Sequence, residues 1–125
     1  MPEVEQKIVL GLIVGYYLLW MLMGLIFYLK PPRKINGLYG YRTFRSMKNP
    51  QNWHYANKLA PKYMIIFMHA CFGIALLYFF LFKDKLSFTA IFLPVNFLYC
   101  FSLIFMIPII ERKLKHFEAK QEQTF

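Results

Sequence analysis

Three stretches of this 125-residue chain contain no Asp, Glu, Lys or Arg: residues 8–29, 63–82 and 86–110. At a rise of about 1.5 Å per residue, each stretch is long enough as a helix to cross a hydrocarbon core of roughly 30 Å. A charged side chain at the centre of such a helix would cost about 2.5–3.5 kcal/mol on insertion, so the absence of charge is informative. These absences exclude an ordinary soluble domain and predict an all-α integral membrane bundle of three transmembrane helices.

Groups that could carry out chemistry are also scarce. The two cysteines, Cys71 and Cys100, lie inside the apolar stretches, which excludes an extracellular disulfide framework and is typical of buried thiols; a structural or redox pair stays an alternative. No nucleophile, base and acid form a recognisable pattern, and His54, His69 and His116 lack the spacing of metal ligands. We therefore expect a protein that is not an enzyme and that holds no metal and no cofactor.

Acidic residues are absent from segment 30–62, which carries eight Lys and Arg. If the chain crosses the membrane three times, this segment and the tail (111–125) share one side and together carry twelve Lys and Arg, against three on the other side. Because such basic flanks stay in the cytoplasm, we expect the N-terminus outside and the C-terminus inside. The chain would then be a single membrane domain (1–125) with a cytoplasmic loop, 30–62, and a cytoplasmic tail that extends the third span as a helix.

The basic loop is expected to contact the lipid bilayer through anionic headgroups at the cytoplasmic face. Held at a membrane surface and lacking a recognisable nucleic-acid-binding fold, it is not expected to bind nucleic acid. The first span is expected to be retained rather than cleaved as a signal peptide, because Glu3 and Glu5 precede it where a signal peptide is basic.

Proline and polar spacing within the loop predict two short interfacial helices. Pro31 and Pro32 would end the first span, since neither can donate a backbone hydrogen bond. The polar residues at helical spacing after this point are Arg42, Arg45, Ser46 and Asn49. The pair Asn49-Pro50 is typical of a helix start, with Asn as the N-cap and Pro in the first turn, and Pro61 would end that second helix.

The apolar stretches contain two polar side chains of interest. His69 lies in the second span, where an ionisable residue is a functional candidate, although a neutral histidine hydrogen-bonded within the bundle is an alternative. Asn96 lies beside Pro94 in the third span, where it would satisfy the carbonyl that proline frees or a neighbouring helix, or contact a substrate. Gly11 and Gly15 have the small-xxx-small spacing that allows close helix packing, within the bundle or in a dimer.

A set of uncharged residues around two arginines is too specific in composition to serve only as a lipid anchor. Anchoring explains basic residues, whereas arginines that bind carbonyls, phosphates or carboxylates require ordered polar neighbours. The motif residues are Asn36, Gly40, Tyr41, Arg42, Thr43, Arg45, Ser46, Asn49, Trp53 and Asn57. Together with Ala56, they resemble the signature of the SdpI family of bacterial membrane proteins, in which the same string lies between hydrophobic segments. Phe44 departs from the family, which commonly has proline at this position.

The resemblance implies a multi-pass protein of the bacterial cytoplasmic (inner) membrane that confers immunity to, or senses, a membrane-active toxin peptide. The arginine motif would be its structural or functional centre. An alternative from another class is a small accessory subunit that packs against a larger membrane complex, since the small and aromatic surfaces fit that role equally well. The partners expected are thus a toxin peptide, another membrane protein or a second copy of the chain.

Overall fold

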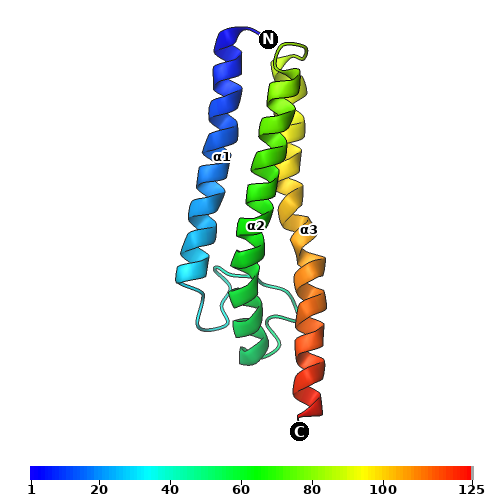
Figure 1. Cartoon of the computed structure of the whole chain (residues 1–125). Coiled ribbons are helices and arrows are strands. Elements are labelled where there is room, and N and C mark those ends of the chain that lie inside the picture. Colours follow the sequence, from blue (N-terminus) through cyan, green and yellow to red (C-terminus); the bar gives the residue numbers. More distant parts are fainter. Residues whose placement is uncertain (125) are drawn as a thin grey trace.

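Three long helices make up most of the chain in the computed structural model, which describes residues 1–124 (Figure 1). They are α1 (Glu3–Leu29), α2 (Pro50–Phe82) and α3 (Phe88–Gln123), and no strand occurs in the described part of the chain. Each helix contains a window that is long and apolar enough to cross a membrane. The predicted all-α fold with three candidate membrane spans is therefore confirmed.

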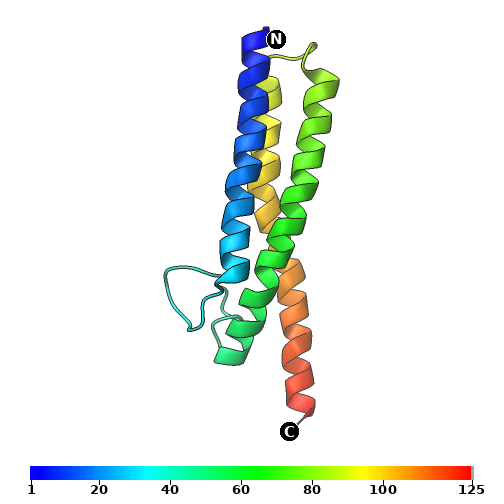
Figure 2. The same cartoon turned by 60° about the vertical axis from the view of Figure 1, so that its left-hand side comes forward.

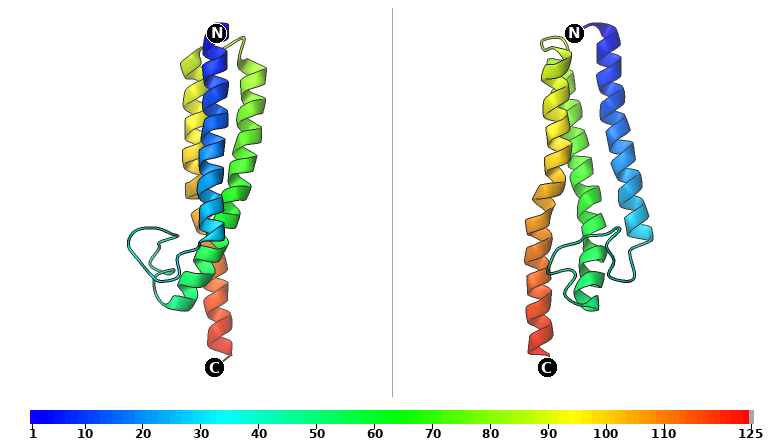
Figure 3. Two further views of the ribbon diagram at one scale, coloured as in Figure 1. Left: turned by 90° about the vertical axis from the view of Figure 1, so that its left-hand side faces the viewer. Right: turned by 180° about the vertical axis from the view of Figure 1, so that it is seen from behind.

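The second and third helices form a tight antiparallel hairpin, and the first helix packs mainly against the second (Figures 1 and 2). Ser87 caps α3 by accepting a hydrogen bond from Ala90 N at 3.4 Å. The turn between α2 and α3 lies beside the N-terminus, where Gln6 Nε2 donates to Asp84 Oδ1 over 3.1 Å. The loop from Lys30 to Asn49 lies at the opposite end of the bundle, beside the part of α3 that continues to the C-terminus (Figure 3).

The bundle buries a thin apolar core and exposes apolar side chains around its outside. The core is formed by Val9, Ile13, Met64, Met68, Cys71, Ala75, Phe79, Ile91, Val95 and Tyr99. Large exposed side chains include Leu18, Leu22, Ile66, Leu77, Phe97 and Phe105. An apolar outer surface of this extent would aggregate in water, whereas lipid tails solvate it well.

The loop differs from the prediction of two short helices. Residues 30–49 contain turns and bends but no helix. Ser46 explains this locally: its hydroxyl accepts from Thr43 N at 2.8 Å and donates to Tyr41 O at 3.0 Å, and such side-chain bonds compete with helix formation. The second predicted helix is the beginning of α2, which continues without a break into the second apolar stretch.

The start of α2 is as predicted, but its predicted end at Pro61 is wrong. Asn49 caps the helix by accepting from Asn52 N at 2.8 Å, and Pro50 follows it. The helix continues through Pro61 to Phe82, because a proline in a long, well-packed helix removes one backbone hydrogen bond without stopping the chain.

A tyrosine of α2 accommodates the first proline of α3, Pro94. Pro94 cannot donate to the Ala90 carbonyl, and the hydroxyl of Tyr78 on α2 donates to that oxygen instead at 3.1 Å. Asn96 bonds to neither the freed carbonyl nor another helix: its Nδ2 donates to Phe92 O of its own helix at 2.8 Å. The helix then continues to Gln123, as predicted for the tail.

Candidate functional site

The loop is fixed to the first turns of α2 by two buried side chains. Trp53 Nε1 donates to Pro32 O at 2.9 Å. Asn57 Oδ1 accepts from Tyr41 N at 2.6 Å, while its Nδ2 donates to Tyr41 O at 3.3 Å and to Trp53 O at 3.0 Å. Trp53 is completely buried and Asn57 is 3% exposed. These bonds give partners to the Pro32 carbonyl and the Tyr41 amide of the loop, which would otherwise be left without one.

Glycine is the only residue type that fits at position 40. Its φ of 112° lies in a region that side chains with a Cβ rarely adopt. A Cβ there would also lie 2.5 Å from Asn57 Oδ1 and 2.8 Å from Pro32 Cγ. The glycine thus allows the loop backbone to approach Asn57 closely enough for Tyr41 to hydrogen-bond with it.

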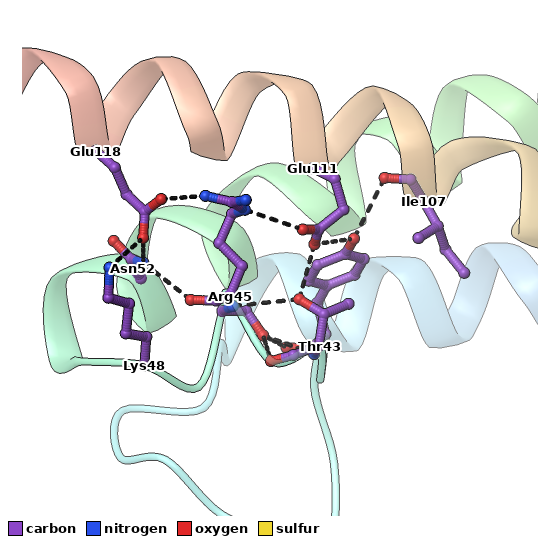
Figure 4. A network of polar contacts seen from close by, with 9 residues as sticks. Thr43, Arg45, Lys48, Asn52, Ile107, Glu111 and Glu118 are labelled. Carbon is purple, nitrogen blue, oxygen red and sulfur yellow. Dashed lines mark hydrogen bonds and ion pairs between the residues drawn. The ribbon is translucent and has the colours of Figure 1, made fainter.

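Two glutamates of α3 hold the other side of the loop, and Figure 4 shows the arrangement. Glu111 Oε1 accepts from the hydroxyls of Tyr41 at 2.9 Å and Thr43 at 2.7 Å. Its Oε2 lies 3.4 Å from Arg45 Nε. The Glu111 carboxylate therefore binds every second residue of this part of the motif, namely Tyr41, Thr43 and Arg45.

Glu118 lies two turns farther along the same face of α3 and also binds Arg45, through its Oε2 (Figure 4). Its Oε1 accepts from Asn52 Nδ2 at 2.6 Å and lies 3.5 Å from Lys48 Nζ. Asn52 Nδ2 also donates to Arg45 O at 2.9 Å. We call Glu111 and Glu118, with the loop and α2 side chains that they bind, the carboxylate clamp.

The environment of the clamp sets the protonation of its members. Burial opposes ionisation of Glu118, but the hydrogen bonds from Asn52 and Arg45 and the charges of Arg45 and Lys48 outweigh it and lower the pKa of Glu118. Burial, followed by the hydrogen bond to Glu111 and its charge, raises the pKa of Tyr41, which therefore stays a neutral donor.

The remaining motif residues have local roles in the structure. Asn36 Oδ1 accepts from Leu38 N at 2.9 Å and Tyr39 N at 3.0 Å, which closes a turn at the tip of the loop. Arg42 is exposed and its guanidinium donates to Gly37 O, so it takes no part in the carboxylate clamp. The structure therefore separates the two arginines of the motif: Arg45 joins the loop to α3, and Arg42 stays within the loop.

An apolar pocket of about 340 Å³ lies beside this network, between the loop and the three helices. Its apolar side chains include Trp20, Met23, Phe27, Ala60, Met64, Leu103 and Met106. Motif residues Gly40, Tyr41, Arg42, Thr43 and Asn57 line it too. The motif thus contributes a polar end to a pocket whose other walls come from the bundle, and this volume suits one or two apolar side chains or part of a lipid chain.

The two intramembrane polar residues lie elsewhere. His69 Nε2 is 3.0 Å from the hydroxyl of Tyr17 on α1, and its Nδ1 is 2.9 Å from Ile65 O. Since a carbonyl can only accept, Nδ1 carries a proton, and the hydroxyl of Tyr17 is the hydrogen-bond partner of Nε2. Neither His69 nor Asn96 lines the apolar pocket.

Sequence reasoning missed Asn52, Glu111 and Glu118. Glu111, Leu114 and Glu118 are spaced by three and four residues, which places them on one face of a helix, and Leu114 is fully buried on that face. The spacing was visible in the sequence, but the alternating charges of the tail are also typical of a solvated helix. Their contacts with the loop and with Asn52 distinguish these two glutamates from the others, and a single sequence does not show such contacts.

Residues 33–110, more than half of the chain, match the family model described as the SdpI/YfhL protein family. The chain belongs to this family. The matched segment takes in the loop motif, all of α2 and the membrane-spanning part of α3, and it stops one residue before Glu111. Family membership and the three apolar helices together make this SdpI/YfhL protein a multi-pass membrane protein.

The relative named "Uncharacterized protein YfhL" from Bacillus subtilis (strain 168) is 42% identical over 48 residues. The match covers 38% of this chain and 44% of that relative, so this SdpI/YfhL protein aligns with less than half of the relative's length. No solved structure matches the chain.

Proposed function

We propose that this SdpI/YfhL protein binds a membrane-active peptide inside the bilayer and thereby confers immunity to it or senses it. Family membership supports this role, because the family takes its name from immunity proteins against a secreted toxin peptide. The observation that carries the proposal is the apolar pocket of about 340 Å³ with the motif at its polar end. The proposal assigns no catalytic step, metal or cofactor to the chain.

The proposed location is the bacterial cytoplasmic membrane, with the N-terminus outside and the loop inside. The twelve Lys and Arg on the loop side against three on the other support this orientation. In it, the carboxylate clamp lies at the cytoplasmic face, and a ligand would reach the pocket from the inner leaflet.

The pocket chemistry defines what a peptide would have to present. Methionine and aromatic walls adapt to aliphatic or aromatic side chains of varied shape. Arg42 at the polar end would offer a cation to a carboxylate of the peptide, since its present acceptor is only the exposed carbonyl of Gly37. The clamp would keep Tyr41 and Thr43 in place, because both residues line the pocket and bind Glu111.

The test is protection of a peptide-sensitive bacterium that expresses the chain. Wild type should raise survival in the presence of the peptide, and Met23→Trp should abolish protection because the larger side chain fills the pocket. Leu22→Trp is the matched control, because Leu22 is the adjacent residue and 58% exposed on the outer surface. Equal accumulation of the two variants in the membrane is the required check. Protection by Met23→Trp at the wild-type level would refute the role of the pocket, and unchanged killing of cells with wild type would refute the immunity function.

A second candidate is an accessory subunit of a larger membrane complex, or a homo-oligomer. It is favoured by Gly11, Gly15 and Gly73, because a methyl group added at any of them would meet nothing within 4 Å. These small residues therefore leave helix surface open to another helix, which suits close helix contacts in a membrane. Purification in mild detergent tests it: a lone monomer with no second protein would count against this candidate.

A further inference from the structure

A second cavity, of about 470 Å³, lies on another side of the loop base. It is lined by Tyr28, Pro31, Pro32, His54, Asn57, Lys58 and Lys62. It shares only the wall residues Pro32 and Asn57 with the apolar pocket, and it contains three side chains that can carry positive charge but no carboxylate. Its chemistry is therefore that of an anion site.

The three basic side chains lie in a row on α2. His54, Lys58 and Lys62 are four residues apart, so they share one helix face at intervals of about 6 Å. All three are exposed, and none forms an ion pair with a carboxylate of residues 1–124. Arg45 and Lys48 of the same loop side are, by contrast, paired with glutamates.

The row begins where the apolar part of the bundle ends. A methyl group at Gly24 of α1 would lie 3.1 Å from Cγ1 of Ile65, so the two antiparallel helices meet at these positions. Lys62, three residues nearer the loop, therefore lies level with the last turn of α1, and Tyr28 lines the same cavity. The headgroup layer beyond the hydrocarbon core is about 5–8 Å thick on each side, so Lys62 and Lys58 would lie within it if the core ends at the last turn of α1.

The cavity has fixed walls. The prolines restrict the backbone, and the Trp53 hydrogen bond to Pro32 O holds that segment against α2. Asn57 is held by its bonds to Tyr41 and Trp53. On the membrane side, Ile66 lies one turn beyond Lys62 and is 61% exposed, so it offers apolar surface in line with the basic row.

We propose that this cavity binds the phosphate headgroup of one anionic lipid molecule per chain. The ammonium groups of Lys58 and Lys62 contact the phosphate oxygens, His54 borders the outer end, and an acyl chain runs along Ile66. This is a discrete site, distinct from general attraction of the basic loop to the membrane, and it does not rest on the peptide proposal.

Native mass spectrometry of the full chain in detergent micelles tests the site, with dioleoylphosphatidic acid, dioleoylphosphatidylcholine and inorganic phosphate as probes. Wild type should bind one phosphatidic acid at low lipid ratio, well before any phosphatidylcholine. Each lysine near an anionic headgroup contributes roughly fivefold in affinity, so Lys58→Gln/Lys62→Gln should weaken binding about 30-fold. If the double variant fails to accumulate, the two single variants are tested instead, and each should weaken binding about fivefold.

The control is Lys115→Gln/Lys120→Gln, which removes the same charge from exposed positions on α3. Affinity of this control within twofold of wild type supports a discrete site. Equal weakening by the two double variants would mean diffuse electrostatic attraction and would overturn the proposal. If inorganic phosphate binds as tightly as phosphatidic acid, the cavity is a site for a soluble phosphate compound, and the proposal of a lipid ligand is overturned.

Discussion

Replacing Gly40 by alanine should destabilise the whole loop, because it affects both the backbone and Asn57. The φ of 112° would place a residue with a Cβ in a rarely populated region, at a cost of about 1–3 kcal/mol. The new methyl group would also lie 2.5 Å from Asn57 Oδ1, a contact that requires one of the two groups to move.

If Asn57 moves to relieve this contact, its side chain also loses hydrogen bonds. Its side chain makes three bonds, to Tyr41 N, Tyr41 O and Trp53 O, and each contributes about 0.5–1.5 kcal/mol. The loss of even two of them, added to the backbone strain, gives an expected destabilisation of about 3 kcal/mol for Gly40→Ala.

The assay is reversible unfolding in mixed micelles with increasing dodecyl sulfate, followed by circular dichroism. Gly37→Ala is the matched control in the same loop, since its Cβ would meet nothing within 4 Å and its φ is not positive. We expect this control to stay within about 0.5 kcal/mol of wild type. Equal stability of the two variants would refute the argument that the Asn57 contact requires glycine.

Four further predictions concern the clamp and the loop. Arg45→Ala should lower the free energy of unfolding by about 1–2 kcal/mol in the same assay, because partly exposed Arg45 binds two carboxylates. Arg42→Ala should change it by less than about 0.5 kcal/mol and accumulate normally, so a large loss would contradict the surface position of Arg42. The lowered pKa of Glu118 means that its contribution is fully present above the usual value of 4.5 and is lost as the pH falls below it; Glu118→Gln should flatten this part of the stability–pH profile. Trp53→Phe leaves the Pro32 carbonyl without its donor and should cost about 1–3 kcal/mol, which a melting curve without a downward shift would disprove.

The membrane helices could be predicted from the sequence because their signal is simple. A run of about 20 residues without charge, such as 63–82, has few structural options, since a backbone in lipid must satisfy its own hydrogen bonds. The cap at Asn49 was equally predictable, because the side chain and the following proline act on adjacent residues.

The loop could not be predicted to the same extent, because its conformation depends on distant partners. The polar spacing from Arg42 to Asn49 suits a helix, but Arg45 binds glutamates that lie 66 and 73 residues away in the sequence. Pro61 was a similar case: packing around the proline, which a single sequence does not reveal, decided that α2 continues. The motif residues could be identified from the sequence, but the contacts between them could not be predicted from it.

The two-turn separation of Glu111 and Glu118 restricts how the tail can change in length. Seven residues bring a helix back to nearly the same direction, so both carboxylates reach Arg45 from one face of α3. A single residue inserted between them would rotate Glu118 by about 100° and turn it away from the loop, whereas a seven-residue insertion would keep its direction and move it about 10 Å farther out. The interval between these glutamates should therefore tolerate many substitutions but hardly any insertion or deletion.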